Sequence, residues 1–214
     1  MTNFQDEAGA DLVATARRLG PDGLATGTAG NLSVRVAPDR ILVTPSGVAY
    51  GTLQTGHLCL VSEAGEVIEA GPHAPSTELP MHLAAYRATG AGAVVHTHSP
   101  YATTLGTLVD EIPGVHYLVA LLGGPVRVAA YATPGSAELA AGMAAGLEGR
   151  SALLLGNHGA VTVGATLHEA YERAVLLEWL CALYYRARLA GEPRILDAGE
   201  LARVAALLEH YLEG

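Results

Sequence analysis

Hydrophobic and polar positions follow two different periods along this chain. Apolar residues that recur every three or four positions predict amphipathic helices, whereas alternation or a short β-branched run predicts a strand. The predicted helices cover 6–19, 78–89, 136–147, 167–190 and 197–212, and the predicted strands cover 32–36, 40–44, 57–61, 92–97, 125–129, 152–155 and 161–163. Helices and strands interleave, and the first two strands form a hairpin around Pro38-Asp39. We therefore predict an α/β fold with a mixed or antiparallel sheet.

Composition then narrows the functional classes. The formal net charge of −9 over 214 residues argues against nucleic acid, whose phosphates require a basic face. The uncharged segment 91–109 contains two histidines and a proline, so we predict no membrane span. Residues 1–11 have acidic but no basic side chains, which does not fit a secretory signal. Cys59 and Cys181 are then expected to be buried free thiols, and the expected location is the cytoplasm.

One residue type is missing from the chain. All twelve basic residues are arginines, and lysine does not occur. Schiff-base chemistry requires a lysine amine, and a P-loop also requires its lysine. Any carbanion or phosphate chemistry in this sequence must therefore use a metal, arginines or neutral hydrogen-bond donors.

The strongest candidate for chemistry is His96-Thr97-His98, which ends an apolar run that Pro100 stops. Side chains alternate along a strand, so His96 and His98 point to the same side, roughly 7 Å apart at the backbone. Both imidazoles could then reach one metal ion.

Two further residues could join this pair. His158 follows the apolar run 152–155 in a turn with Gly159, and Glu78 is expected in the first turn of a helix that Ser76 or Thr77 caps. Three imidazoles and one carboxylate suit zinc or a similar divalent ion. Taken alone, His158 would be a turn residue, and Glu78 would complement the helix dipole.

Three short segments combine glycines with hydroxyl or amide side chains, at 27–31, 44–47 and 75–77. Free backbone N–H groups together with hydroxyls can hold a phosphate without a basic residue. Each segment, taken singly, also fits an ordinary turn.

Seven motifs, in this order, resemble the class II aldolase/adducin-like family. They are GTAGNLSVR (27–35), TPSG (44–47), PSTE (75–78), VVHTHS (94–99), HYLVALLGG (116–124), YATPG (131–135) and NHG (157–159). The resemblance implies one three-layer αβα domain over residues 1–214, around a mixed and largely antiparallel sheet. It also implies a homotetramer with active sites between subunits.

The resemblance further implies a reaction, and it is greatest to family members that act on L-fuculose 1-phosphate. Such an enzyme reversibly cleaves a ketose 1-phosphate to dihydroxyacetone phosphate and an aldehyde, here L-lactaldehyde, with one Zn²⁺ per subunit. Glu78 would be the base, and Tyr117 would exchange a proton with the aldehyde oxygen across a subunit boundary. The implied metal ligands are Glu78, His96, His98 and His158, the implied phosphate site is Thr28, Gly30, Asn31, Ser46, Gly47, Ser76 and Thr77, and Tyr211 is a possible tail contact.

Other activities stay open. Related ribulose-phosphate epimerases have aspartate in place of Glu78 and a further histidine in place of Tyr101, which favours an aldolase here. Rhamnulose-phosphate aldolase and methylthioribulose-phosphate dehydratase share the metal site, and adducin-like members are binding modules without it. A zinc hydrolase that uses Glu78 as base is the alternative if the resemblance misleads. His82, one helical turn after Glu78, could support the site without binding metal.

Overall fold

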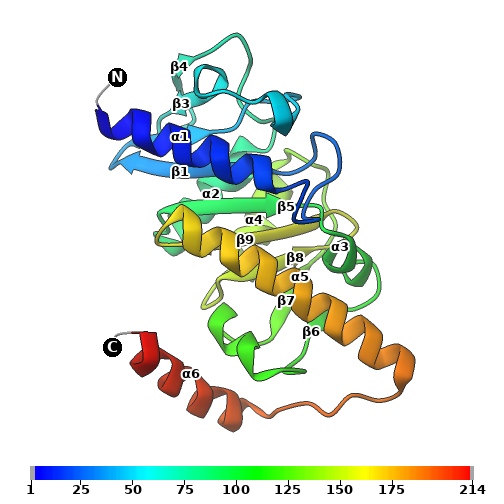
Figure 1. Cartoon of the computed structure of the whole chain (residues 1–214). Coiled ribbons are helices and arrows are strands. Elements are labelled where there is room, and N and C mark those ends of the chain that lie inside the picture. The colour runs from blue at the N-terminus through cyan, green and yellow to red at the C-terminus, as the bar shows by residue number, and fades with distance from the viewer. Residues whose placement is uncertain (1–2, 213–214) are drawn as a thin grey trace.

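A single sheet organises the molecule, which we describe from a computed structural model covering residues 3–212, with side chains from 7 to 208 (Figure 1). Within these residues the sheet has nine strands in the order β4-β3-β2-β1-β5-β9-β8-β7-β6. Only β7 and β8 pair in parallel among the described strands. The strands are β1 (Asn31–Ala37), β2 (Arg40–Val43), β3 (Cys59–Val61), β4 (Val67–Ala70), β5 (Ala93–Thr97), β6 (Glu111–Ile112), β7 (Val126–Ala129), β8 (Ala152–Leu155) and β9 (Gly159–Gly164).

Helices cover both faces of this sheet. They are α1 (Asn3–Arg18), α2 (Leu79–Thr89), α3 (Pro100–Leu105), α4 (Ala137–Gly146), α5 (Leu167–Ala190) and α6 (Ala198–Leu212), with short 3₁₀ turns η1 (Tyr50–Thr52), η2 (Thr55–His57) and η3 (Tyr117–Leu122). The central strand β5 shows how the layers form. Ala93 and Val95 lie in one apolar cluster with α1 and α5, whereas Val94 lies in another with α2 and α4. Alternate side chains of one strand therefore pack into two apolar cores, one on each face of the sheet. The predicted three-layer αβα fold with a largely antiparallel sheet is confirmed.

Helix ends follow local signals where those signals are present. α5 begins after Thr166, whose side chain accepts a hydrogen bond from the Glu169 backbone N–H, and it ends at Gly191. α4 begins after Ser136 in the same way, with the Leu139 N–H as donor. Both helices match the sequence prediction for this reason.

The start of α2 corrects our prediction. Glu78 was expected in the first helical turn, with Ser76 or Thr77 as cap, but the helix begins at Leu79 and Glu78 occupies the N-cap position. The Ser76 hydroxyl instead accepts the backbone N–H of Glu78 within the preceding turn. Pro80, in the first helical turn, fits this later start because a helix tolerates proline there. Glu78 therefore leaves the helix axis and can point toward the sheet.

The sequence prediction missed β4, β6, α3 and the three 3₁₀ turns. β4 is exposed along its whole length, so it lacks the apolar face that marks a half-buried strand. β6 has only two residues, and α3 and η3 have six each. These pieces are too short for periodicity to reveal them.

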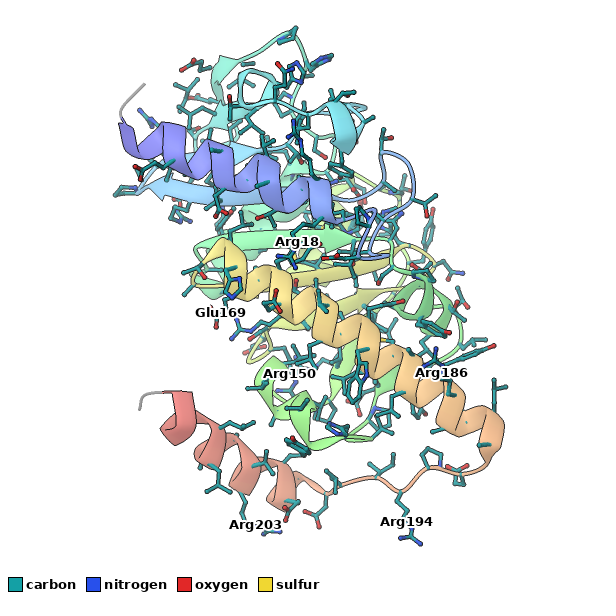
Figure 2. The ribbon with its side chains drawn as sticks, in the orientation of Figure 1. Arg18, Arg150, Glu169, Arg186, Arg194 and Arg203 are labelled. Atoms are coloured by element: carbon teal, nitrogen blue, oxygen red, sulfur yellow. The ribbon has the colours of Figure 1, made fainter. Side chains whose placement is uncertain are left out.

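Charged side chains lie on the outside and in part join the helices. Arg18 of α1 forms ion pairs with Asp22 and with Glu172 of α5, and its guanidinium lies 4.4 Å from the centre of the Tyr171 ring. Figure 2 shows Arg194 and Arg203 projecting away from the body of the protein. No helix within residues 3–212 has both the length and the apolar character to cross a membrane. Cys59 and Cys181 are buried free thiols, as expected.

Candidate metal centre

Three separate elements deliver four side chains to the carboxyl end of β5. His96 belongs to β5 and His98 follows it, Glu78 precedes α2, and His158 lies in the turn between β8 and β9. That turn sits directly against β5, because a Cβ added at Gly159 would lie 2.2 Å from the Thr97 carbonyl oxygen. Only glycine permits this approach, which brings His158 beside the other two histidines.

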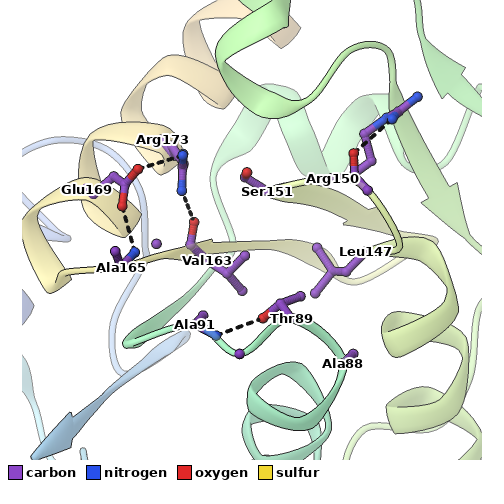
Figure 3. A pocket seen from close by; sticks show the side chains of 13 residues that line it. Ala88, Thr89, Ala91, Leu147, Arg150, Ser151, Val163, Ala165, Glu169 and Arg173 are labelled. Carbon is purple, nitrogen blue, oxygen red and sulfur yellow. Dashed lines mark hydrogen bonds and ion pairs between the residues drawn. The ribbon is translucent and has the colours of Figure 1, made fainter. Parts of the chain in front are cut away.

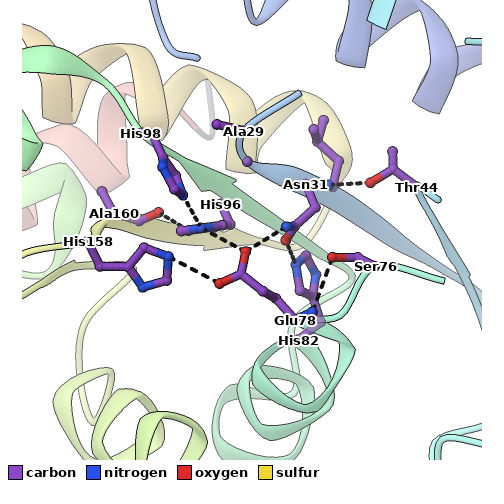
Figure 4. Close-up of polar contacts among 12 residues, drawn as sticks. Ala29, Asn31, Thr44, Ser76, Glu78, His82, His96, His98, His158 and Ala160 are labelled. Carbon is purple, nitrogen blue, oxygen red and sulfur yellow. Dashed lines mark hydrogen bonds and ion pairs between the residues drawn. The ribbon is translucent and has the colours of Figure 1, made fainter. Parts of the chain in front are cut away.

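We call Glu78, His96, His98 and His158 the His–Glu cluster (Figure 4). His96 Nε2 lies 3.0 Å from His98 Nε2 and 3.1 Å from Glu78 Oε2, and His158 Nε2 lies 3.1 Å from Glu78 Oε1. One ligand atom from each residue falls within 4.8 Å of all the others. The three rings stand at steep angles of 70°, 72° and 88° to one another, with centroids 4.8 to 5.0 Å apart.

Several atoms of the cluster fit a metal ion better than they fit one another. Glu78 Oε1 and His158 Nδ1 are buried and have no hydrogen-bond partner among the described residues, although Oε1 is close to His158 Nε2. His96 Nδ1 donates to the Ala160 carbonyl at 2.9 Å, which leaves Nε2 of the neutral ring as a ligand. A donor set of imidazoles and one carboxylate is suited to zinc and similar divalent ions. The four residues could therefore hold a metal.

The electrostatic environment of the cluster favours the protonation states that bind a metal, an ionised carboxylate and a neutral imidazole. Burial opposes ionisation of Glu78, but the His158 and His96 side chains beside its carboxylate and the hydrogen bond from Asn31 hold its pKa well below the usual range. Burial lowers the pKa of His98 to about 4, and the neighbouring His96 and His158 contribute to that shift. A carboxylate therefore faces a neutral imidazole at pH 7, which is the state that binds a metal.

The predicted phosphate segments border the cluster. The Thr44 carbonyl accepts from Ser76 N, and Ser46 N donates to the Ala74 carbonyl, so the segments 44–47 and 75–77 run side by side. Gly30 lies so close to β5 that an added Cβ would stand 2.7 Å from the His96 carbonyl oxygen. Among the predicted residues, Thr28, Ser46, Gly47 and Thr77 are exposed, Gly30 is half-buried, and Asn31 and Ser76 are buried.

Asn31 has a more specific place than its motif indicates. Its Nδ2 donates to Glu78 Oε2 at 2.8 Å, and its Oδ1 lies 2.5 Å from Nε2 of the buried His82. Ser33 and Tyr86 continue this contact behind the cluster and were not identified in the sequence. The signal for Ser33 was the polar side of the alternating segment Asn31–Ala37, which faces His82 and Tyr86 of α2.

Of the two predicted tyrosines, Tyr117 packs in an aromatic group with His116, and the side chain of Tyr211 lies outside the described residues. Tyr117 begins η3 with its side chain 47% exposed, and its ring packs on His116 with centroids 4.5 Å apart. His116 also contacts Trp179 of α5, so these rings form a separate aromatic group. Tyr211 falls among residues 209–214, whose side chains lie outside the described part.

A carboxylate that we did not identify in the sequence fixes the chain after His98. Glu178 of α5 accepts the backbone N–H groups of Tyr101 and Ala102, at 2.8 and 2.9 Å, at the start of α3. Its negative charge also complements the helix N-terminus. The partners are more than 70 residues apart, so no local pattern reveals this contact.

A separate hollow lies away from the cluster. A cavity of about 520 Å³ opens at the other end of β5, between the end of α2 and the start of α5 (Figure 3). We call it the arginine hollow, after Arg150 and Arg173 in its wall. Its charged groups are paired: Arg173 contacts Glu169 and the Val163 carbonyl, and Arg150 donates to the Pro125 carbonyl.

Comparison with known proteins agrees with the fold and the cluster. The family described as Class II Aldolase and Adducin N-terminal domain matches residues 10–185. The chain is 43% identical over 203 residues to a 5-methylthioribulose-1-phosphate/5-deoxyribulose-1-phosphate aldolase of Rhodospirillum rubrum, which covers 94% of this chain and 90% of that protein. It is 37% identical over 192 residues to an L-fuculose phosphate aldolase of Escherichia coli, which covers 88% of each.

A solved structure of an L-fuculose 1-phosphate aldolase superposes with a TM-score of 0.91 at 34% identity, covering 95% of this chain and 96% of the other. Sequence and architecture therefore agree over nearly the whole chain. This protein belongs to the class II aldolase and adducin N-terminal domain family.

Proposed function

We propose that this protein is a metal-dependent aldolase that reversibly cleaves a ketose 1-phosphate to dihydroxyacetone phosphate and an aldehyde. The observation that carries the proposal is the His–Glu cluster, in which three imidazoles and one carboxylate converge and Glu78 Oε1 has no hydrogen-bond partner. The alternative of an adducin-like binding module gives no reason to bury four such side chains together.

In this proposal Glu78, His96, His98 and His158 hold one Zn²⁺ per subunit. A divalent ion in this position would act as a Lewis acid toward the carbonyl oxygen of the substrate. Glu78 moves the proton at C3. In the condensation direction it takes a proton from dihydroxyacetone phosphate, and in the cleavage direction it returns one after the C3–C4 bond breaks.

Tyr117 is proposed to exchange the second proton, at the oxygen on C4. Its exposed ring, which packs on His116, supports a role in a neighbouring subunit's site. This requires an oligomer, which we propose to be a homotetramer in the cytoplasm. Tyr211 is proposed as a further contact from the tail.

The phosphate is proposed to lie among the segments 27–31, 44–47 and 75–77. Thr28, Ser46 and Thr77 offer exposed hydroxyls, and Gly30 and Gly47 have positive φ values of 79° and 70°, typical of tight turns with accessible N–H groups. Asn31 and Ser76 complete the set. The three segments contain neither lysine nor arginine, so neutral donors of this kind are what they offer to a phosphate.

The named relatives differ in the aldehyde half of their substrates. Cleavage between C3 and C4 releases dihydroxyacetone phosphate from L-fuculose 1-phosphate, 5-deoxyribulose 1-phosphate and 5-methylthioribulose 1-phosphate alike. The aldehydes are lactaldehyde, acetaldehyde and methylthioacetaldehyde. We propose ketose 1-phosphates of this group as the substrate class, with L-fuculose 1-phosphate and 5-deoxyribulose 1-phosphate as the first two to compare.

Release of dihydroxyacetone phosphate tests the proposal, because this product is common to all three sugars. The protein is incubated with each sugar phosphate, with and without a chelator, and the product is reduced enzymatically with NADH. We expect release that the chelator abolishes and added Zn²⁺ restores. Epimerase and dehydratase activities release no dihydroxyacetone phosphate, so conversion of a sugar phosphate without this product would overturn the aldolase assignment.

A further inference from the structure

A line of buried polar side chains leads away from the His–Glu cluster, between β1 and α2. We call its members, Asn31, Ser33, His82 and Tyr86, the polar chain; Figure 4 shows its inner part. Asn31 Nδ2 lies 2.8 Å from Glu78 Oε2, and Asn31 Oδ1 lies 2.5 Å from His82 Nε2. Ser33 Oγ lies 2.7 Å from His82 Nδ1 and 2.8 Å from the Tyr86 hydroxyl.

The polar chain is shut off from solvent. Ser33 and His82 are fully buried, Tyr86 is 2% exposed and Asn31 is 5% exposed. Buried polar groups need partners within the protein, and here the polar groups satisfy one another in sequence. If one side chain exchanged its donor and acceptor positions, two donors or two acceptors would face each other. This requirement fixes the orientation of every member.

The direction of every hydrogen bond follows from the carboxylate. Glu78 only accepts, so the Asn31 amide presents its nitrogen to Glu78 and its oxygen to His82. That oxygen requires a proton on His82 Nε2, and Nδ1 of the neutral ring then accepts from Ser33. The Ser33 oxygen in turn accepts from Tyr86. All four bonds therefore point toward Glu78.

We propose that His82 is a positioning residue for Glu78: by donating from Nε2 it fixes the Asn31 amide, which holds Oε2 and leaves Oε1 for the ion and the proton. This inference rests on the proposed function. A histidine nitrogen that binds a metal has no proton to donate. In the loaded site Asn31 would thus be the donor that still holds the carboxylate, and its orientation would depend on His82.

Two substitutions at His82 separate positioning from packing. A glutamine amide reaches about as far as the imidazole Nε2, so H82Q keeps a donor toward Asn31. An asparagine amide reaches only as far as Nδ1, so H82N keeps the Ser33 contact and loses the donor. Both variants remove the ring, and we expect similar falls in Tm.

The metal-free variants are then titrated with Co²⁺ against a competing chelator, and the visible spectrum of the bound cobalt is recorded. H82N should bind Co²⁺ about 10- to 100-fold more weakly, with an altered spectrum, and its kcat should fall with KM within about twofold. H82Q should stay within about threefold of the wild type. Equal Co²⁺ affinities and spectra in the two variants would overturn the role of His82.

A double-mutant cycle tests whether His82 acts through Asn31. If it does, H82N combined with N31A binds Co²⁺ no more weakly than N31A alone. Additive losses would mean that His82 acts by another route and would overturn the proposal.

The nitrogen NMR spectrum of the metal-free protein tests the direction of the chain without an ion. We expect His82 as the neutral tautomer with its proton on Nε2 at pH 7, and a proton on Nδ1 would overturn the inference. A wild-type protein that binds no Co²⁺ would overturn the proposed function together with the role of His82. Normal Co²⁺ binding by the wild type with no difference between H82Q and H82N would overturn only the role of His82.

Discussion

The two ends of β5 contrast in what they contain. Beyond its carboxyl end lies the His–Glu cluster, where titratable side chains crowd together and Glu78 Oε1 has no hydrogen-bond partner within the described structure. Before its amino end lies the arginine hollow of about 520 Å³, where Arg173 pairs with Glu169 and both arginines donate to backbone carbonyls.

The pairing of polar groups, rather than open volume, distinguishes the two ends of β5. Volume alone marks the arginine hollow, but satisfied polar groups have no unmet demand for a ligand. The His–Glu cluster instead brings like imidazoles into contact at 3.0 Å, an arrangement that a shared cation would stabilise. Buried polar atoms without a hydrogen-bond partner, rather than open volume, therefore identify the reactive end of β5.

Replacement of His96, the central residue of the His–Glu cluster, should have the largest effect on activity. His96 contacts both Glu78 and His98, so H96A should lose the ion. Loss of Lewis-acid stabilisation worth several kcal/mol predicts a fall in kcat/KM of about 1,000-fold or more. The measurements are metal content and release of dihydroxyacetone phosphate. H73A, at an exposed histidine, is the matched control and should retain both; retention of activity by H96A would exclude the cluster as the active site.

Removal of one charge should separate binding from catalysis. E78Q keeps the shape of the side chain and an oxygen that can bind a metal, but it cannot take up a proton as a carboxylate does. We expect kcat to fall by about 100-fold while much of the metal is retained. The assays are steady-state kinetics and metal analysis of the same preparation. An active E78Q enzyme would mean that another group moves the proton at C3.

The sequence predicted the reactive end of β5 better than the elements around it. His96, His98 and His158 follow apolar runs, and strand ends of this kind were recognisable locally. Their convergence with Glu78 required that three separate segments meet, which the family resemblance supplied and spacing alone did not. The predicted helix boundary misplaced Glu78 by one position, although it correctly placed this residue beside the start of the helix.

The contacts that the sequence did not reveal are those between distant segments. The alternation of Asn31–Ala37 is typical of a strand with one solvated face, yet Asn31 and Ser33 are buried under α2. His82 and Tyr86, one turn apart on that helix, supply their partners. The Glu178 contact with α3 is likewise set by tertiary structure. The choice of aldehyde also stays outside local sequence patterns, since the relatives that the chain resembles act on different ketose 1-phosphates.

Acid should lower the free energy of unfolding of the metal-free protein, because buried histidines lie at and behind the carboxyl end of β5. Burial lowers the pKa of His82 to about 3 and of His98 to about 4, whereas both rise to about 6.5 on unfolding. The unfolded chain therefore binds more protons below pH 6.5, and the free energy of unfolding should fall by up to about 1.4 kcal/mol per pH unit for each residue.

Urea denaturation of the metal-free protein from pH 7 to pH 5 measures this effect. This pH range lies above the pKa values of carboxylates in an unfolded chain. The arginines of the hollow stay charged throughout, so they contribute no slope. H82Q should reduce the slope of the free energy of unfolding against pH by the contribution of one histidine. A wild-type profile that is flat over this range would show that the buried histidines take up protons as freely in the folded protein as in the unfolded chain.

The smallest effect is expected in the arginine hollow, and it is the sharpest test of the contrast. Arg173 pairs with Glu169 at 2.6 Å and donates to the Val163 carbonyl at 2.7 Å, and both side chains are partly exposed. A partly exposed pair of this kind contributes about 0–1 kcal/mol, so R173Q should lower Tm by only a few degrees. It should leave kcat/KM and KM for the sugar phosphate within about twofold, measured by the same release of dihydroxyacetone phosphate. A tenfold rise in KM with unchanged Tm would mean that the hollow binds part of the substrate. Paired polar groups would then no longer distinguish the inert end of β5 from the reactive one.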